Sequence, residues 1–203
     1  MRALSLAHCA RGPLERVIAA RYPEQMDVTR IPVGHKPPHD LNAIIEIPQG
    51  GPPVKYELDK PSGALFVDRF LHTSMSYPAN YGFIPHTISE DGDPCDVLVI
   101  TQVPVVSGAV VRCRPIGVLM MEDEAGPDEK IIAVPVDELN PYYTGVRSFE
   151  DLPLILREQI THFFRHYKDL EEGKWVRIQR WAGPEEAFAV IEKAIARAKS
   201  NQT

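Results

Sequence analysis

Short runs of apolar residues, separated by turn-forming residues, make up most of the chain between residues 42 and 136. We predict β-strands at residues 42–47, 54–58, 64–68, 97–100, 109–118 and 130–136. Proline and glycine cluster between the first three strands, which is the spacing typical of an all-β sandwich or barrel. Residues 77–85 are rich in aromatic and turn-forming residues, and we interpret them as a segment whose rings pack in the core.

The apolar pattern changes from a period of two to a helical period near the end of the chain. In residues 152–169 the apolar positions are three or four residues apart, and residues 185–199 repeat this pattern. The positions that carry it are Leu152, Leu156, Ile160, Phe163 and Tyr167 in the first segment, and Ala187, Val190, Ile191, Ala194 and Ile195 in the second. We therefore predict a mainly β fold followed by two amphipathic helices.

The length and composition fit one globular domain with an appended segment. The chain has 203 residues, of which 44% are hydrophobic, and residues 26–203 are expected to form that domain. Residues 1–25 differ because they hold four arginines and only two acids, and we expect a flexible N-terminal extension. An alternative interpretation is an organelle presequence, which is also rich in arginine and poor in acids.

Charge and cysteine content exclude some classes of partner. The net charge of -6 argues against nucleic acid, because phosphate contacts require clustered lysine and arginine. No apolar run in the sequence is long enough to span a bilayer, which argues against a membrane protein. The three cysteines are odd in number and lack CxxC spacing, so we expect reduced thiols and a cytoplasmic location.

The candidate chemistry centres on residues 91–96, where Asp91, Asp93 and Asp96 occur with no basic residue among them. Two such carboxylates about 5 Å apart repel by roughly 3 kcal/mol at an effective dielectric of about 20. The segment must therefore stay hydrated, take up protons or bind cations. Gly92 and Pro94 favour a bend that can make all three side chains converge, and the buried strand at 97–100 would anchor them.

Carboxylate oxygens suit Mg²⁺, Mn²⁺ or Ca²⁺ better than zinc or copper. The segment is not an EF-hand loop, because its sixth position is Asp96 and its twelfth is Gln102, where that loop has glycine and glutamate. A solvated acidic turn is the alternative interpretation. A second acidic stretch at residues 121–130 either forms an exposed hairpin or completes a site for several metal ions.

Other residues could bind an anion, although the sequence leaves this open. Lys55 and Glu57 share one face of a predicted strand, as an exposed ion pair or as part of an anion-binding wall. Tyrosine hydroxyls in residues 77–85 can donate to a phosphate oxygen. Tyr167 and Lys168 either line a phosphate pocket or are an ordinary core tyrosine beside a surface lysine, and their spacing does not decide between these roles.

These residues occur within motifs that resemble a known family. Asp91-Gly92-Asp93-Pro94-Cys95-Asp96-Val97 is similar to the defining motif of the soluble family I inorganic pyrophosphatases. Further matching segments follow the order of the family's bacterial branch, at residues 45–48, 55–57, 63–69, 77–82, 123–130 and 166–170. The resemblance extends from about residue 40 to residue 195.

The resemblance implies a five-stranded OB-like closed barrel flanked by two C-terminal α-helices, assembled as a homo-hexamer. It also implies hydrolysis of inorganic pyrophosphate to two phosphates with several Mg²⁺ ions, for which Mn²⁺ can substitute, and a metal-activated water as the nucleophile. Two metal ions about 3.5–4 Å apart can clamp the attacking and leaving oxygens of such a displacement. Lysine and arginine on the opposite wall would neutralise the phosphate that leaves.

The resemblance also implies a role for each site residue. Asp93 is expected to accept a proton from the nucleophilic water. The metal ligands would be Asp91, Asp96, Asp123 and Asp128. The substrate-binding residues would be Lys55, Arg69, Tyr81, Tyr167 and Lys168, with Glu46, Glu57, Tyr77 and Lys130 as supporting residues.

Two other functions compete with pyrophosphate hydrolysis. The chain could be an OB-type barrel that binds single-stranded nucleic acid through aromatic residues, which the net charge disfavours. It could also be a calcium-binding structural protein.

Cys95 lies where the family usually has an aliphatic residue. We interpret it as a small apolar filler, the alternative being a thiol whose oxidation distorts the metal loop.

Overall fold

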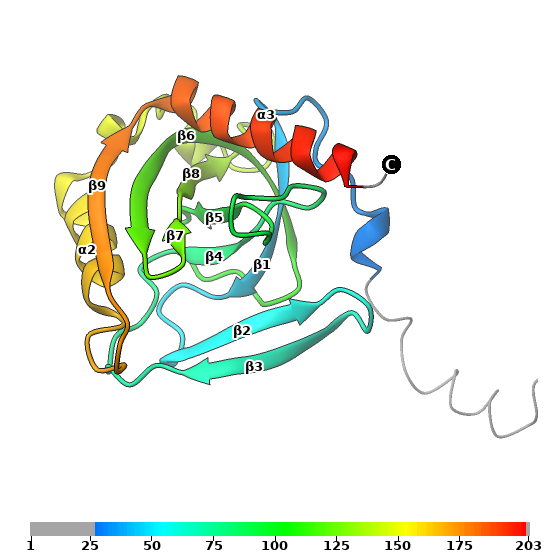
Figure 1. Ribbon diagram of the computed structural model, residues 1–203. Coiled ribbons are helices and arrows are strands. Elements are labelled where there is room, and N and C mark those ends of the chain that lie inside the picture. Colours follow the sequence, from blue (N-terminus) through cyan, green and yellow to red (C-terminus); the bar gives the residue numbers. More distant parts are fainter. Residues whose placement is uncertain (1–26, 202–203) are drawn as a thin grey trace, which may run out of the picture.

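The computed structural model of the protein describes residues 27–201, and within them five strands form a closed barrel (Figure 1). Around the ring these strands are β1 (Leu41–Ile47), β4 (Asn80–Phe83), β5 (Asp96–Val99), β8 (Lys130–Pro135) and β6 (Val110–Asp123). The ring closes because β6 also pairs with β1. Within the ring β5 and β8 run parallel, while the other neighbours are antiparallel. The predicted five-stranded barrel is therefore confirmed.

The remaining strands extend or flank this ring. The hairpin of β2 (Val54–Asp59) and β3 (Ala64–Phe70) forms a separate two-stranded sheet beside the barrel (Figure 1). The short β7 (Gly126–Pro127) and the longer β9 (Val176–Ala182) both pair with β6. Single 3-10 turns occur at η1 (Val28–Arg30), η2 (Pro141–Tyr143) and η3 (Phe149–Asp151).

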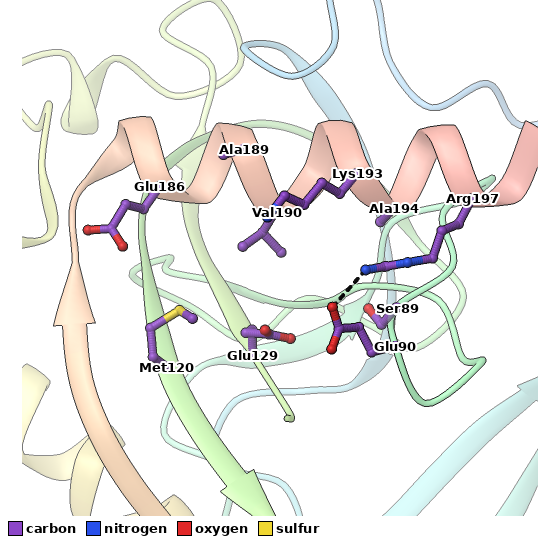
Figure 2. A pocket seen from close by; sticks show the side chains of 10 residues that line it. All are labelled: Ser89, Glu90, Met120, Glu129, Glu186, Ala189, Val190, Lys193, Ala194 and Arg197. Atoms are coloured by element: carbon purple, nitrogen blue, oxygen red, sulfur yellow. Dashed lines mark hydrogen bonds and ion pairs between the residues drawn. The ribbon is translucent and has the colours of Figure 1, made fainter. Parts of the chain in front are cut away.

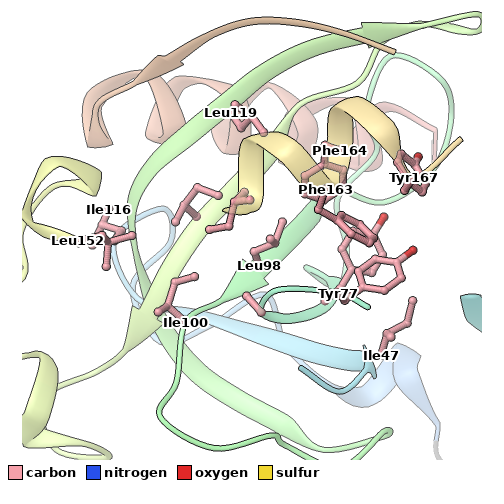
Figure 3. Close-up of a cluster of buried hydrophobic side chains, with 14 of the residues drawn as sticks. Ile47, Tyr77, Leu98, Ile100, Ile116, Leu119, Leu152, Phe163, Phe164 and Tyr167 are labelled. Carbon is pink, nitrogen blue, oxygen red and sulfur yellow. The ribbon is translucent and has the colours of Figure 1, made fainter. Parts of the chain in front are cut away.

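Both faces of the central strands are buried, which explains their continuous apolar sequence. On β5, Val97 and Val99 belong to a cluster that includes residues of α3 (Pro184–Ser200). Leu98 belongs to a second cluster, which includes residues of α2 (Leu154–His166) and is drawn in Figure 3. The barrel is thus fixed between the two helices, and the loops at its ends are held on a rigid frame.

The helices are amphipathic as predicted, with small changes in their bounds. The predicted helix at 152–169 begins later, at Leu154, because Pro153 takes the N-cap position and a 3-10 turn precedes it. It ends at His166, so Tyr167 and Lys168 follow the helix. The second helix has Pro184 in its first turn, where a missing N–H is tolerated. No helix within residues 27–201 combines the length and the apolar composition that crossing a membrane requires.

Within residues 27–201 the structure contains three strands that the pattern did not predict. β4 falls in the turn-rich segment 77–85, β9 falls in a charged segment between the helices, and β7 has only two residues. Strand β6 also continues beyond the predicted end at residue 118 to Asp123, because β9 pairs with this extension. The predicted extension at residues 1–25 lies outside the described residues.

Candidate active site

A cavity of about 410 Å³ lies between the open end of the barrel, the β2–β3 hairpin and the residues that follow α2. Every residue to which the motifs gave a role lines it: Glu46, Lys55, Glu57, Arg69, Tyr77, Tyr81, Asp91, Asp93, Asp96, Asp123, Asp128, Lys130, Tyr167 and Lys168. Residues more than a hundred positions apart in the chain thus face one space. Their proximity is an observation, whereas their roles remain a prediction.

Five aspartates form one side of the cavity, which we call the aspartate wall: Asp91, Asp93, Asp96, Asp123 and Asp128. The first two lie on the loop between β4 and β5, the third begins β5, and the fourth ends β6. Asp128 follows the short strand β7. The barrel brings them together because β5 and β6 both pair with β8.

The loop that carries Asp91 and Asp93 has a defined internal structure. Gly92 has φ of 96°, in the region that favours glycine. The Asp93 N–H donates to Asp91 Oδ1 at 3.0 Å, and the Ser89 N–H donates to the Asp93 carbonyl at 2.7 Å. Burial raises the pKa of Asp91, and the charges of Asp93 and Asp96 raise it further. The bend predicted from Gly92 and Pro94 is present.

Two lysines neutralise part of the aspartate wall. The side chain of Lys130 is 4% exposed and its ammonium contacts the carboxylates of both Asp96 and Asp128. Burial alone would lower the pKa of Lys130, but these carboxylates outweigh it and the pKa lies above its ordinary value. Lys168 Nζ lies 2.7 Å from Asp123 Oδ2. Both ammonium groups are therefore compensated in the interior, where an unpaired charge would be costly.

The donor atoms of the wall suit a hard divalent cation, since they are carboxylate oxygens. No group of three or more histidine, cysteine, aspartate or glutamate side chains within residues 27–201 is close enough together to hold a metal ion. Lys130 contacts two of the aspartates and Lys168 a third, so these carboxylates are paired with ammonium groups in this structure. By their chemistry the aspartates fit a site for hard divalent cations.

The β2–β3 hairpin contributes cationic groups to the cavity. Lys55 and Arg69 are cross-strand partners on β2 and β3. Glu171 positions the Arg69 guanidinium at 3.1 Å, and Arg69 also donates to Asp68 at 2.8 Å. Such a paired guanidinium has little rotational freedom and can bind two oxygens of a phosphate.

The tyrosines of the cavity are neutral hydrogen-bond donors. Tyr77, Tyr81 and Tyr167 are each less than 9% exposed. Burial raises the pKa of all three hydroxyls above the ordinary value. Tyr77 packs on Phe163 of α2 with ring centroids 4.6 Å apart. Helix α2 therefore fixes Tyr77 in the lining of the cavity.

Glu46 is a buried acid that joins the barrel to the hairpin. It is 7% exposed and accepts a hydrogen bond from the Leu58 N–H at 2.8 Å. Burial raises its pKa from 4.5 to about 7. Among the cavity's carboxylates it is therefore suited to hold a proton near neutral pH.

Three further charged residues line the cavity although the motifs gave them no role: Lys60, Glu124 and Lys174. Lys174 Nζ lies 2.5 Å from Glu124 Oε1. Burial alone would raise the pKa of Glu124, but hydrogen bonds, of which that from Lys174 is the largest contribution, and the charge of Lys168 outweigh it and lower that pKa to about 2. Glu124 belongs to the acidic stretch 121–130, which could have indicated it. Lys174 lies in a polar turn without a distinguishing pattern.

Cys95 lies beneath the loop and is 2% exposed. Burial raises the pKa of its thiol to about 11, so the thiol is protonated at neutral pH. This agrees with its interpretation as a small packing residue.

Comparison with known proteins assigns the family. The family model described as inorganic pyrophosphatase matches residues 43–199. The chain belongs to the soluble family I inorganic pyrophosphatases. Members of this family hydrolyse pyrophosphate to phosphate with the help of metal ions, and the chain is accordingly a hydrolase.

Individual relatives agree with this assignment. The inorganic pyrophosphatase of Caulobacter vibrioides is 68% identical over 172 residues, which are 85% of this chain and 97% of the relative. That of Rhodospirillum rubrum is 61% identical over 171 residues, 84% of this chain and 96% of the relative. A crystal structure described as inorganic phosphatase from Anaplasma phagocytophilum is 49% identical and covers 83% of this chain and 99% of its own, with a TM-score of 0.82.

Proposed function

We propose that hydrolysis of inorganic pyrophosphate, the reaction of this family, takes place in the cavity at the aspartate wall. The observation that carries this proposal is the gathering of opposite charges around one cavity. Five aspartates line it together with Lys130 and Lys168, which contact the aspartate wall, and the β2–β3 hairpin adds Lys55 and Arg69. Pyrophosphate carries several negative charges near neutral pH, so it needs cations on one side and fixed positive groups and donors on the other.

The metal ions are proposed to be several Mg²⁺, held by Asp91, Asp96, Asp123 and Asp128, with Mn²⁺ as a substitute. Bound there, they would lower the pKa of a water and polarise phosphoryl oxygens. The raised pKa values of Asp91 and Asp128, which burial causes and neighbouring carboxylates increase, support this proposal. A site with excess negative charge binds divalent cations favourably.

Asp93 is proposed to accept the proton of the attacking water. It lies on the exposed loop next to Asp91, and its backbone is fixed by hydrogen bonds to Asp91 and Ser89. A carboxylate held on a structured loop can remove a proton without first reorganising.

Lys55, Arg69, Tyr81, Tyr167 and Lys168 are proposed to bind the substrate. Phosphoryl transfer has a loose transition state, so positioning and charge neutralisation provide most of the catalysis. Glu46, Glu57, Tyr77 and Lys130 are proposed to support these groups. The contacts of Lys130 with two aspartates and of Glu57 with Lys55 agree with this role.

A phosphate-release assay with pyrophosphate tests the proposal. We expect release with Mg²⁺, slower release with Mn²⁺, and none after treatment with EDTA. The absence of release with Mg²⁺ would contradict the function. The competing functions give other results: a nucleic-acid module would shift single-stranded DNA in a salt-sensitive way, and a calcium-binding structural protein would bind Ca²⁺ without releasing phosphate.

The assembly and its location are also proposals. We propose a cytoplasmic homo-hexamer. Leu154 and Ile155 on α2 are 60% and 62% exposed, and Phe70 on β3 is 68% exposed, which leaves apolar surface that other copies could cover. The thiols of Cys95 and Cys113 are free and buried, as is usual in a reducing compartment.

A further inference from the structure

Helix α3 contacts the back of the loop that carries Asp91 and Asp93, on the side away from the cavity at the aspartate wall. Figure 2 shows this region, a smaller cavity of about 180 Å³ between α3, Met120 of β6 and the loop. Lys193 and Arg197 both line it from the helix. Neither residue lines the larger cavity in which the reaction is proposed to occur.

Arg197 connects the helix to the loop at two points. Its Nη1 donates to the Ile88 carbonyl at 3.0 Å, and its Nη2 donates to Glu90 Oε1 at 2.9 Å. The second contact is the dashed line in Figure 2. The Ile88 N–H in turn donates to the Ala194 carbonyl at 3.0 Å. Residues 88–90 are therefore fixed to the last turns of α3 by one backbone bond and by the Arg197 guanidinium.

These contacts lie directly before the functional residues. Glu90 is followed by Asp91, and the Ser89 N–H donates to the Asp93 carbonyl. The base of the loop is fixed independently, because Thr87 Oγ1 accepts from the Cys95 N–H at 2.9 Å and donates to the Ile84 carbonyl. Arg197 thus acts on the exposed part of the loop.

The helix provides a rigid support for this contact. Its positions Ala187, Ile191 and Ala194 are fully buried in the cluster that joins α3 to the barrel. Arg197 is only partly buried, with its side chain 36% exposed, and the side chain of Glu90 is 55% exposed. An exposed ion pair of this kind adds little to global stability. Its effect is therefore expected on the position of the loop and not on the folding of the chain.

We propose that Arg197 is a positioning residue for the reaction: it holds residues 89–93 of the loop so that Asp93 and Asp91 reach their places in the cavity. This inference rests on the proposed function of that cavity. Small displacements of reacting groups lower rates strongly. The hydrogen bonds of Arg197 go to Ile88 and Glu90, which do not line that cavity. The loss of the Arg197 side chain should therefore lower kcat and leave the binding of pyrophosphate nearly unchanged.

The test compares Arg197→Met with Lys193→Met, a matched control one turn earlier that lines the same small cavity. For Arg197→Met we expect kcat to fall about tenfold, with KM changed less than about twofold. Arg197→Lys keeps one cationic donor and should recover kcat to within about threefold of the original protein. Lys193→Met should match the original protein. An equal loss in Lys193→Met, or no loss in Arg197→Met, would overturn the proposal.

A second measurement does not depend on activity or on metal ions. Amide hydrogen exchange of Ser89 and Gly92 in the EDTA-treated protein should accelerate about tenfold in Arg197→Met, while exchange in the barrel strands stays the same. Unchanged exchange at Ser89 would refute the positioning role. This result does not depend on phosphate release, so it separates a failure of the positioning role from a failure of the proposed function. If Arg197→Met does not fold, Glu90→Ala at an exposed position provides the same comparison.

Discussion

At the scale of single residues, the cavity depends on compensation of buried charge. The side chain of Lys130 is buried, yet it retains its charge because Asp96 and Asp128 contact its ammonium. Tyr77 and Tyr81 are buried without a charge and remain donors. At neutral pH the surroundings of these groups therefore reinforce their ordinary protonation states, charged for Lys130 and neutral for the tyrosines.

Asp93→Asn should leave the fold intact and remove most activity. Asp93 is exposed, so the substitution changes no packing, but an amide cannot accept the proton of the attacking water. We expect kcat to fall by about 10²-fold or more at unchanged thermal stability. Phosphate release and circular dichroism measure the two effects. Turnover equal to that of the original protein would show that Asp93 does not have this role.

Glu46→Gln should change how stability depends on pH. The pKa of Glu46 is about 7 in the folded protein and 4.5 in the unfolded chain, so the folded state binds more protons between these values. Its contribution to stability is present below pH 4.5 and is lost as the pH rises through about 7. The variant avoids this loss, which is on the order of 3 kcal/mol.

Urea unfolding in EDTA at pH 5 and pH 8 measures this difference for Glu46→Gln. The variant should gain stability relative to the original protein at the higher pH, because the introduced amide remains neutral while the carboxyl group of Glu46 ionises. Parallel stability curves for the two proteins across this range would contradict the raised pKa.

At the scale of elements, the barrel depends on close approaches that the hydrophobic pattern does not encode. Strand β4 has four residues, all buried, and lies between β1 and β5. A Cβ atom at Gly82 would lie 1.9 Å from the Ile44 carbonyl oxygen of β1. Gly82 makes the sequence of this segment resemble a turn. The same residue allows β4 to pack as a strand, because it has no Cβ atom.

Gly82→Ala should separate β1 from β4 and destabilise the protein. We expect a loss of about 3 kcal/mol or more, because the clash is with backbone and cannot be relieved by a side-chain rotation. Gly145→Ala is the control, since this exposed glycine has no neighbouring heavy atom within 4 Å of an added Cβ. Urea unfolding should place Gly145→Ala close to the original protein. Similar curves for the two variants would show that β1 and β4 tolerate a wider spacing.

At the scale of the whole molecule, the closed barrel forms the cavity at one end, and apolar side chains remain exposed on the outer surface of the protein. Leu154 and Ile155 project from α2 and are more than half exposed. Together with the resemblance to bacterial pyrophosphatases, this surface supports the proposed homo-hexamer. A buried interface of this kind would be disrupted by a charge at its centre.

Light scattering should give a mass of about six times the 22.8 kDa of one chain. Ile155→Asp should lower that mass, because a carboxylate at an apolar interface loses its hydration without gaining a partner. Lys193→Asp, an exposed position on α3, is the control and should retain the mass of the original protein. A monomer in the original protein, or an unchanged mass in Ile155→Asp, would contradict the proposal that α2 contributes to assembly.

The sequence by itself determined the local features of this protein. It identified the bend at Gly92 and Pro94, six of the nine strands within residues 27–201, and both helices, because these features depend on backbone preferences and on which face of an element is apolar. The matching motifs also indicated the residues that line the cavity and the family.

Only the tertiary structure decided how these parts combine. Strand β9 carries two arginines and a glutamine among its seven residues and pairs with the edge of β6, and Gly82 becomes part of a strand because two neighbours pair on either side of it. The contact of Lys130 with Asp96 arises from the parallel pairing of β5 and β8. Pairing partners lie far apart in the chain, so their choice follows from the closure of the barrel and not from any local pattern.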